Sequence, residues 1–201
     1  MSKKFKVAII GDFQDGKSTL VNALMGQEVA TVGWRVAQTS EVTAYDLPDS
    51  SVAMLDTPGA NVADAKRRDD TAKMLKGCEM ADAIVFMLRK QISPPQIKLL
   101  RQATNNGKKV FTIMVNDHDD DVAPQRVIES SAKELDASGL HPILFGEEGI
   151  VVNAKARSKG KACDDEQGWQ RLRYLLGVGQ PGKSPLERIA ILYNKINEIT
   201  R

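Results

Sequence analysis

The sequence has few of the residues that build disulfide frameworks or metal clusters. Its two cysteines, Cys78 and Cys163, lie far apart, and its two histidines, His118 and His141, have no further ligands at metal-site spacing. Zinc sites and disulfide scaffolds place such residues at short, regular intervals. We therefore expect reduced thiols, which are typical of an intracellular protein, and no metal centre built on histidine or cysteine.

Long apolar runs and a strong charge imbalance are missing as well. No apolar run approaches the roughly 20 residues that a membrane-spanning helix needs. The basic start is followed by the apolar residues 7–10 alone, which is too short for a signal peptide. Lys plus Arg is 28 and Asp plus Glu is 26, so the net charge of +2 does not indicate a nucleic-acid partner. These absences predict a cytoplasmic protein without a transmembrane segment.

What the sequence does contain is an alternation of apolar and helical segments. Its 201 residues are enough for one α/β domain with a core. Continuous apolar runs are typical of strands that are buried on both faces of a parallel sheet. The runs cover 5–10, 52–55, 83–88, 110–115 and 150–152, and the helical patterns cover 17–25, 68–78, 95–106 and 124–137. Together with an antiparallel edge strand at 41–47, they predict a mostly parallel sheet between helical layers.

The pattern loosens toward the end of the chain. Residues 155–165 are polar and basic and are expected to form a loop, followed by a short helix at 167–176. We assign residues 1–178 to the domain and residues 179–201 to a linker and an amphipathic helix, in which Ser184 and Glu187 form a helix-start pattern. One face of that helix carries apolar residues, which either pack on the domain's own core or dock a partner: Leu186, Ile189, Ala190, Tyr193 and Ile196.

The most informative motif lies between the first apolar run and the first helical pattern. Residues Gly11–Ser18 read GDFQDGKS and match GxxxxGK[ST], the phosphate-binding loop. Lys17 is expected to reach the β- and γ-phosphates, and the Ser18 hydroxyl to ligate Mg²⁺. Glycines allow the tight turn in which backbone N–H groups surround phosphate oxygens. The predicted fold is therefore a three-layer α/β/α P-loop NTPase fold, and the other loop residues expected at the nucleotide are Asp12, Phe13, Gln14, Asp15, Gly16 and Thr19.

A second motif, Asp56-Thr57-Pro58-Gly59, follows the apolar run at 52–55. An acidic side chain at a strand end can hold Mg²⁺, directly or through water. Gly59 offers an N–H to a γ-phosphate without side-chain obstruction. Such a contact would order the following segment, and hydrolysis would release it.

Together, GDFQDGKSTLVNALMG and DTPG resemble the G domain of translation-factor-class GTPases, especially the Era-like and dynamin-like branches, over roughly residues 5–156. Phe13 and the run 18–26 are most similar to bacterial dynamin-like proteins. The resemblance implies a threonine that closes over Mg²⁺ and γ-phosphate. Thr39 is our choice by position, with Ser40 and Thr43 as alternatives. The implied switch segments are 33–40 and 59–68.

The same family recognises its base with an NKxD pattern and a later SAK pattern. Asn116 and Asp119 match the first, whereas Asp117 stands where the family has lysine. The Asp119 carboxylate can accept two hydrogen bonds from guanine, a pair that adenine does not offer. For the second pattern we choose Asn153-Ala154-Lys155, which follows the run at 150–152, over the exact match at 131–133, which lies in a helical pattern. Ala154 would donate its N–H to the guanine oxygen, and Lys155 would stack along the base.

Hydrolysis is less clearly specified. Ala60 stands where Ras-like members have the glutamine that orients water. Gln14 is either a ligand of K⁺ or Na⁺ or a plain loop residue, and Arg35 is either an internal arginine finger or a solvated loop cation. Arginine fingers change turnover by about 10³–10⁵-fold, so we expect slow hydrolysis by the isolated chain.

The leading interpretation is a Mg²⁺-dependent GTPase that acts as a switch or assembly domain, with Lys17, Thr39, Gly59 and Gln14 at the reaction. It cycles between GTP and GDP, and its partner is another protein or a nucleotide-dependent second copy. Two alternatives stay open. Asp117 and Asn153 allow an ATPase with relaxed base specificity, and Ala60 allows a nucleotide-binding module that does not hydrolyse.

Overall fold

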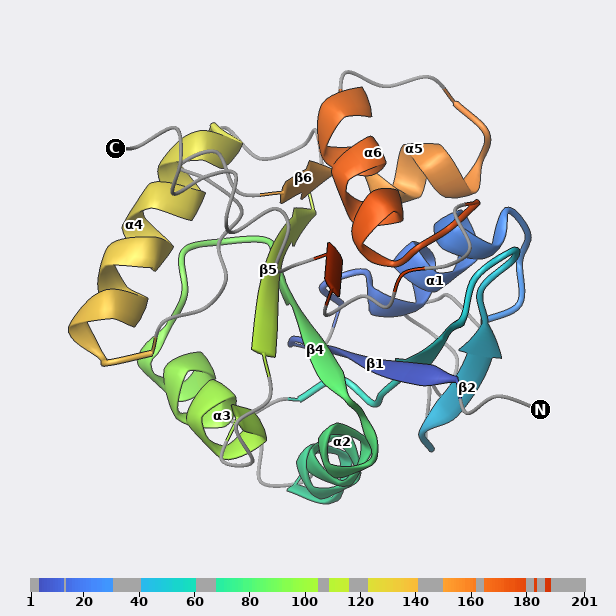
Figure 1. The fold of residues 1–201 in the computed structure, drawn as a ribbon. Coiled ribbons are helices and arrows are strands. Elements are labelled where there is room, and N and C mark those ends of the chain that lie inside the picture. Colours follow the sequence, from blue (N-terminus) through green and yellow to red (C-terminus); the bar gives the residue numbers. More distant parts are fainter. Residues whose placement is uncertain are drawn as a thin grey trace.

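The computed structural model describes residues 4–12, 14–30, 41–60, 68–104, 109–115, 123–140, 150–161, 165–179, 183 and 187–188. These residues contain a six-stranded sheet with the order β2-β3-β1-β4-β5-β6 (Figure 1). Five strands are parallel, and β2 pairs antiparallel with β3, which confirms the predicted fold class. The strands are β1 Phe5–Ile10, β2 Thr43–Asp46, β3 Val52–Asp56, β4 Ala83–Leu88, β5 Lys109–Val115 and β6 Ile150–Val152.

Helices cover both faces of the sheet (Figure 1). They are α1 Lys17–Met25, α2 Arg68–Met80, α3 Pro94–Thr104, α4 Pro124–Ala137, α5 Ala154–Ser158 and α6 Glu166–Leu175. Within the described ranges, none of them has the length and apolarity to cross a membrane. The strand–helix alternation places the loops that follow β1, β3 and β6 at the carboxyl edge of the sheet, where ligands bind in such folds.

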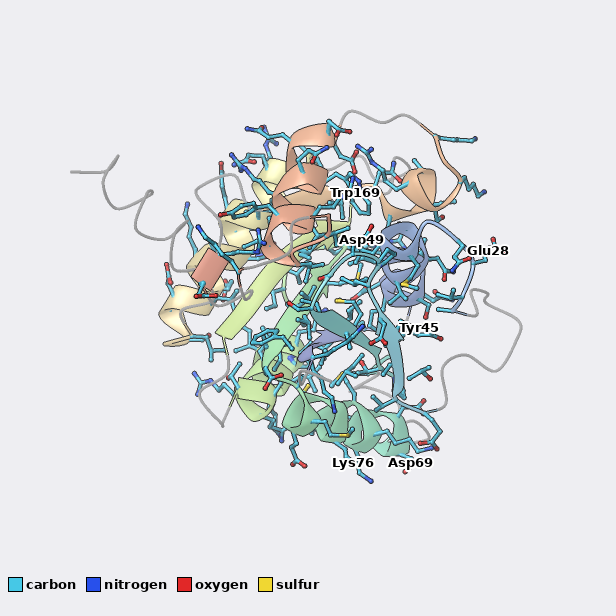
Figure 2. All side chains as sticks on the ribbon, turned by 45° about the vertical axis from the view of Figure 1, so that its right-hand side comes forward. Glu28, Tyr45, Asp49, Asp69, Lys76 and Trp169 are labelled. Carbon is cyan, nitrogen blue, oxygen red and sulfur yellow. The ribbon has the colours of Figure 1, made fainter. Side chains whose placement is uncertain are left out.

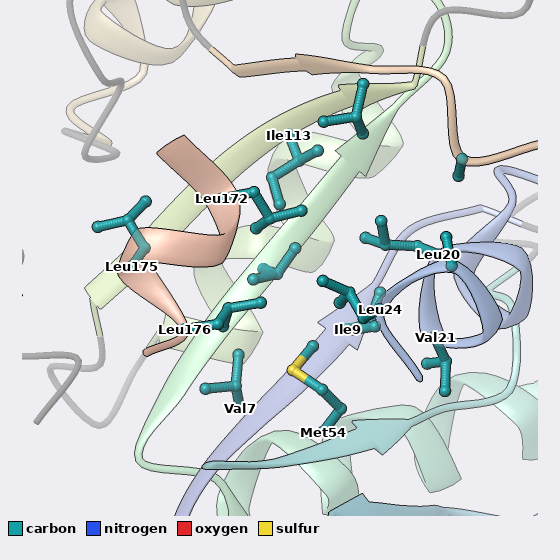
Figure 3. Packing of buried hydrophobic residues seen from close by; sticks show 14 of the residues in the cluster. Val7, Ile9, Leu20, Val21, Leu24, Met54, Ile113, Leu172, Leu175 and Leu176 are labelled. Atoms are coloured by element: carbon teal, nitrogen blue, oxygen red, sulfur yellow. The ribbon is translucent and has the colours of Figure 1, made fainter. Parts of the chain in front are cut away.

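Two apolar layers hold the helices to the sheet. Within β1, Val7 and Ile9 face one layer, which α1 and α6 complete, whereas Ala8 and Ile10 face the other, which α2 and α3 complete. Figure 3 shows the first layer, in which leucines of two helices lie over the strands. Leu20 and Leu24 come from α1, Leu172 lies in α6, and Leu176 caps the end of α6. The central strands are buried on both faces, which is why their sequences are continuously apolar.

The segment after β6 differs from the sequence expectation. Residues 155–165 were expected to be a loop, but 154–158 form the short helix α5. Asn153 begins it, because its side-chain oxygen accepts the N–H of Ala156 at 2.9 Å. The polar and basic composition of this segment indicated a loop because a helix of five residues is too short to show an apolar stripe.

Helix α6 approaches β6 unusually closely at Gly168. A Cβ atom at this position would lie 1.9 Å from the carbonyl oxygen of Val151. Only glycine leaves room for the two backbones to meet at this distance. Gly168 therefore sets the place of α6 against the edge strand β6.

Candidate functional site

The loop between β1 and α1 has the tight course that its glycines predict. Gly16 caps α1 in the left-handed region, with φ 85°. Gly11 has φ 156°, and a Cβ there would lie 3.0 Å from both the Met87 carbonyl oxygen and an Asp15 carboxylate oxygen. Backbone conformation and space both require glycine at these positions. The loop thus ends at the N-terminus of α1, where unpaired N–H groups favour an anion.

Lys17 folds back over this loop. Its Nζ donates to the carbonyl oxygen of Asp12 at 2.7 Å and to that of Gly11 at 3.3 Å. The side chain is buried, and burial lowers the pKa of the ammonium, while the carboxylates of Asp15, Asp56 and Asp12 act in the opposite direction. A compact cation is therefore held at the loop, within reach of any anion that the loop takes up.

Asp15 points into the protein beneath the loop. Its Oδ2 accepts the N–H of Asp12 at 2.6 Å. Burial raises the pKa of the Asp15 carboxyl to about 7, and the nearby ammonium of Lys17 counteracts this only in part. Asp15 therefore stabilises the loop from inside with its carboxylate turned away from the solvent.

Asp12 links the loop to α3. Its Oδ2 accepts a hydrogen bond from Nε2 of Gln96 at 2.9 Å, and burial raises the pKa of its carboxyl. The Gln96 Oε1 in turn accepts the N–H of Ser93 at 2.8 Å and the Ser93 hydroxyl at 2.9 Å. One buried amide thus caps α3 and holds a carboxylate of the phosphate-binding loop.

Two of the three residues proposed as metal ligands, Ser18 and Asp56, meet at the first turn of α1. The Ser18 hydroxyl donates to Oδ2 of Asp56 at 2.7 Å, although the two residues are 38 positions apart in the chain. Asp56 lies at the end of β3 and is only 1% exposed. A hydroxyl and a carboxylate are the oxygen ligands that Mg²⁺ prefers, so the two side chains fit this ion. Among the described residues, no group of three His, Cys, Asp or Glu side chains forms another metal centre.

The segment after Asp56 runs beside the phosphate-binding loop. The Thr57 hydroxyl donates to the Ile9 carbonyl oxygen at 2.6 Å, and the Ala60 N–H donates to the Gly11 carbonyl oxygen at 3.2 Å. Ala60 also forms an isolated parallel bridge with Asp12 and is fully buried. Gly59 lies just before this bridge and is half-buried. The methyl side chain of Ala60 offers no polar atom to orient water.

Gln14 has the backbone geometry of a glycine. Its φ is 71°, and its side chain is exposed. Its carbonyl oxygen accepts a hydrogen bond from Nη1 of Arg89 at 3.4 Å, so a guanidinium at the end of β4 lies beside the loop. A left-handed glutamine is an uncommon conformation that is enriched at functional sites.

Asn153-Ala154-Lys155 lies directly after β6, at the same edge of the sheet. Helix α5, which begins at Ala154, packs beside α1, the helix that follows the phosphate-binding loop (Figure 1). Asn153 and Ala154 are buried, and Lys155 is exposed. The exact SAK match lies inside α4, where the Ser131 hydroxyl accepts the N–H of Ile92 at 3.0 Å, which is a structural contact.

Sequence reasoning missed two charged residues beside this segment. Asp165, just before α6, accepts the N–H of Asn153 at 2.5 Å. It also accepts Nε and Nη2 of Arg157 at 3.1 and 2.6 Å. The Arg157 guanidinium lies over the ring of Trp169, which Figure 2 labels on α6, at 5.4 Å from its centroid. The available sequence signal was an aspartate at a helix start, which is too common to identify this pairing.

Several predicted site residues fall outside the described part of the chain. They are Phe13, Thr39, Asn116 and Asp119, together with the alternative Ser40, the lysine replacement Asp117 and the candidate finger Arg35. The described members come from three separate loops. The structure brings Lys17, Ser18 and Asp56 together, and places the helix that begins at Ala154 against α1.

Comparison with known proteins identifies consistent relatives. The profile of the family described as 50S ribosome-binding GTPase matches residues 6–117. GTPase Era of Lacticaseibacillus paracasei is 30% identical over 148 residues, which are 68% of this chain and 48% of that protein. The tRNA modification GTPase MnmE of Agrobacterium fabrum is 36% identical over 95 residues, or 46% of this chain and 22% of that protein. The chain thus spans about half, or less, of these curated relatives.

Solved structures of Era share the fold. Era in complex with MgGDPNP and a segment of 16S ribosomal RNA superposes with a TM-score of 0.59 at 21% identity, covering 87% of this chain and 57% of that one. Era of Aquifex aeolicus bound to GDP and AlF4⁻ gives the same TM-score and identity, with 91% and 59% covered.

Proposed function

Since the chain belongs to the family of 50S ribosome-binding GTPases, we propose that it binds GTP and GDP with Mg²⁺ and hydrolyses GTP to GDP and phosphate, as a nucleotide-dependent switch or assembly domain. One observation carries the proposal. A buried lysine lies over a glycine-bounded loop at a helix N-terminus, beside a hydroxyl–carboxylate pair 2.7 Å apart. Such a set of groups can hold a triphosphate and its metal ion together.

The phosphates are held by the loop and its lysine. The backbone N–H groups of Phe13, Gln14, Asp15 and Gly16, with those of Lys17, Ser18 and Thr19, surround the phosphate oxygens, whereas the N–H of Asp12 donates to the Asp15 carboxylate and Asp12 lines the loop. The Lys17 ammonium donates to two carbonyl oxygens of the loop. Moving it to the β- and γ-phosphates exchanges these neutral acceptors for charged ones, which make stronger hydrogen bonds.

Ser18 and Asp56 hold Mg²⁺, with Thr39 as the third protein oxygen. When bound, the ion neutralises charge on the phosphates and orients them. The Ser18–Asp56 hydrogen bond keeps both oxygens at one place in its absence. Thr39 and the N–H of Gly59 contact the γ-phosphate, and because Ala60 is bonded to Gly11, this contact connects the phosphate end of the nucleotide to the segment after β3.

Guanine is recognised by residues from two loops. Asp119 accepts hydrogen bonds from the base, Asn116 supports it, the N–H of Ala154 donates to its oxygen, and Lys155 stacks along it. Asn153 stands where the family has serine, and the described contact explains why it fits. Its side chain caps α5 through Ala156, as a serine would.

A specific observation favours slow turnover or a module that binds without hydrolysis. Ala60 is fully buried and apolar, so it leaves the attacking water without a partner at the position where Ras-like proteins use glutamine. Water would then be placed by backbone groups, by K⁺ or Na⁺ near Gln14, or by a second copy. Phosphate release measured with K⁺, with Na⁺ and at increasing protein concentration separates these cases, because a passive module responds to none of them.

The end of the chain is proposed to pack on the domain. Arg188 is only 3% exposed, and its guanidinium lies over the Tyr174 ring at 5.1 Å from the centroid. Its Nε donates to the Lys183 carbonyl oxygen at 3.1 Å. These contacts support a domain of residues 1–178 on which the segment 179–201 is seated, in preference to a free docking helix.

Calorimetry with GTP, GDP and ATP in the presence of Mg²⁺ tests the proposal. We expect GTP and GDP to bind, ATP to bind much more weakly, and Lys17→Ala to weaken the binding of GTP and GDP by about 100-fold. The matched control is Lys98→Ala, which makes the same substitution at an exposed lysine of α3. Equal affinities for GTP and ATP would favour the ATPase alternative, and unchanged GTP affinity in Lys17→Ala would refute the proposed site.

A further inference from the structure

Asp165 is a buried charged residue that the phosphate chemistry does not use. It is 8% exposed, lies immediately before α6, and receives three hydrogen bonds. Two come from Arg157 and one from the backbone N–H of Asn153 at 2.5 Å. A buried carboxylate is expected to be fully hydrogen-bonded. In Asp165, Oδ2 accepts from Asn153, and Oδ1 accepts a forked contact from Nε and Nη2 of Arg157.

The effect of these bonds is to fix the backbone of Asn153. Its N–H is held by Asp165, its side-chain oxygen by the N–H of Ala156 at 2.9 Å, and its carbonyl oxygen by the N–H of Arg157 at 3.0 Å. The N–H, the carbonyl oxygen and the side-chain oxygen of Asn153 are therefore all hydrogen-bonded. The peptide that joins Asn153 to Ala154 has little freedom to rotate, so the direction of the Ala154 N–H is set before any nucleotide arrives.

We propose that Asp165 is a positioning residue for guanine recognition: by holding the N–H of Asn153, it aims the N–H of Ala154 at the oxygen of the base. This inference rests on the proposed function, in which Ala154 reads that oxygen. The direction of the Ala154 N–H would then depend on a residue that lies outside both base-recognition motifs.

Arg157 makes the arrangement rigid. Its guanidinium contacts Asp165 and Glu166 and lies over Trp169, which is itself buried on α6. Trp169 donates its backbone N–H to the Asp165 carbonyl oxygen at 2.9 Å. Because Gly168 brings α6 against β6, the carboxylate is carried on an element whose distance from Asn153 is fixed. A preorganised donor of this kind discriminates ligands more sharply than a mobile one.

An amide cannot replace the carboxylate. In Asp165→Asn one oxygen remains for two donors, and the new amide N–H₂ would face either Asn153 or Arg157, which are both donors. The substitution keeps the shape and removes the positioning bond or the ion pair. It is therefore a specific test of the carboxylate and not of volume.

Base analogues report on each contact separately. GDP is compared with 6-thio-GDP, in which sulfur, a poorer acceptor, replaces the oxygen that Ala154 would read while the N1–H and the amine stay, and with IDP, which lacks the amine that Asp119 would read. In the unchanged protein we expect 6-thio-GDP to bind roughly 3- to 10-fold more weakly than GDP, because the Ala154 N–H is left with a poorer acceptor. In Asp165→Asn we expect this preference to be largely lost, while the preference for GDP over IDP stays unchanged.

Two further variants keep the test independent of folding. Glu166→Gln removes the exposed carboxylate that contacts the same guanidinium but not Asn153, and should leave both preferences unchanged. Arg157→Lys keeps the charge and loses the forked contact, and should weaken the oxygen preference partially. If Asp165→Asn does not fold, the base preferences of Arg157→Lys are compared with those of Glu166→Gln, and only Arg157→Lys should show a weaker preference for the guanine oxygen.

The outcomes distinguish the inference from the proposed function. If the unchanged protein binds GDP and 6-thio-GDP equally, the reading of the oxygen fails, and with it this part of the proposed function. If it prefers GDP, and both Asp165→Asn and Arg157→Lys keep that preference in full, then Asp165 is structural only and the inference is overturned. A loss of both base preferences together, with lowered thermal stability, would also overturn it, because that is the result of general unfolding of the region.

Discussion

The phosphate end and the base end of the site are built in different ways. At the phosphate end, the contacts within the loop join residues three to six positions apart, as when Lys17 and Asp15 fold back on the backbone of Asp12. At the base end, Asn153 is held by Asp165, twelve positions away, across a helix and a turn. A local motif builds its own geometry, whereas a site assembled across elements depends on how those elements pack.

The two ends also balance charge differently. Around the phosphate-binding loop, one ammonium faces the carboxylates of Asp12, Asp15 and Asp56. At the base end, one guanidinium lies between Asp165 and Glu166 over an aromatic ring. The Lys17 ammonium can turn from its partners to an incoming phosphate, whereas the Arg157 guanidinium stays bound to Asp165 and Glu166. We therefore expect substitutions at the first end to change affinity and substitutions at the second to change selectivity.

The largest effect is expected at Lys17. Lys17→Ala should weaken the binding of GDP, IDP and 6-thio-GDP equally, by about 100-fold, because two charge-assisted contacts to phosphate are lost. Titration calorimetry of the three nucleotides measures this. A loss that differed strongly among the bases would contradict the separation of the two ends.

Gly168→Ala should break the base end through packing. Its Cβ would lie 1.9 Å from the Val151 carbonyl oxygen, so α6 must move away from β6. We expect this to lower the free energy of unfolding by about 3 kcal/mol. Gly160→Ala is the control. It has φ 65° and open space around its Cα, and should cost only about 1 kcal/mol. Urea denaturation compares the two, and equal losses would show that α6 does not need this close approach.

Asp15→Asn tests the carboxylate inside the phosphate-binding loop. The folded pKa of about 7 lies above the ordinary value of 3.8, so the folded protein holds more protons than the unfolded chain between these values. Its stability should therefore fall as the pH rises through this window, by about 2 kcal/mol between pH 5 and pH 8.

Asp15→Asn should flatten that part of the pH profile and make the ligand-free protein more stable at pH 8 than the unchanged protein. Thermal denaturation across the pH range is the measurement. A profile of the same slope in both proteins would assign the titration to another group.

The smallest effect is expected where α3 meets the loop. Gln96→Leu keeps the volume but removes the cap of α3 and the donor to Asp12, which should cost about 1 kcal/mol and lower GDP affinity slightly. Gln102→Leu, on the exposed face of the same helix, is the matched control. If both variants keep full stability, the link between α3 and the phosphate end contributes nothing measurable.

Much of the fold was predictable because its signals are local. β1, α1, β4, α4 and β6 begin and end where the apolar and helical patterns indicated, and the edge strand β2 is antiparallel to β3 as predicted, although it is shorter than 41–47. The helix α5 was not predicted, since five residues with a polar surface carry no periodic pattern. At the site, the placement of Lys17, Ser18 and Asp56 followed from motif and strand order.

The amino-acid sequence by itself determined the phosphate end, because a glycine-bounded loop between a buried strand and a helix has one stable course and sets its own hydrogen bonds. Only the tertiary structure decided the partners of that loop and of the base end. Gln96 reaches Asp12 from another helix, and Asp165 reaches Asn153 because Gly168 lets α6 lie against β6. Such contacts depend on distances between packed elements, which no local pattern of residues encodes.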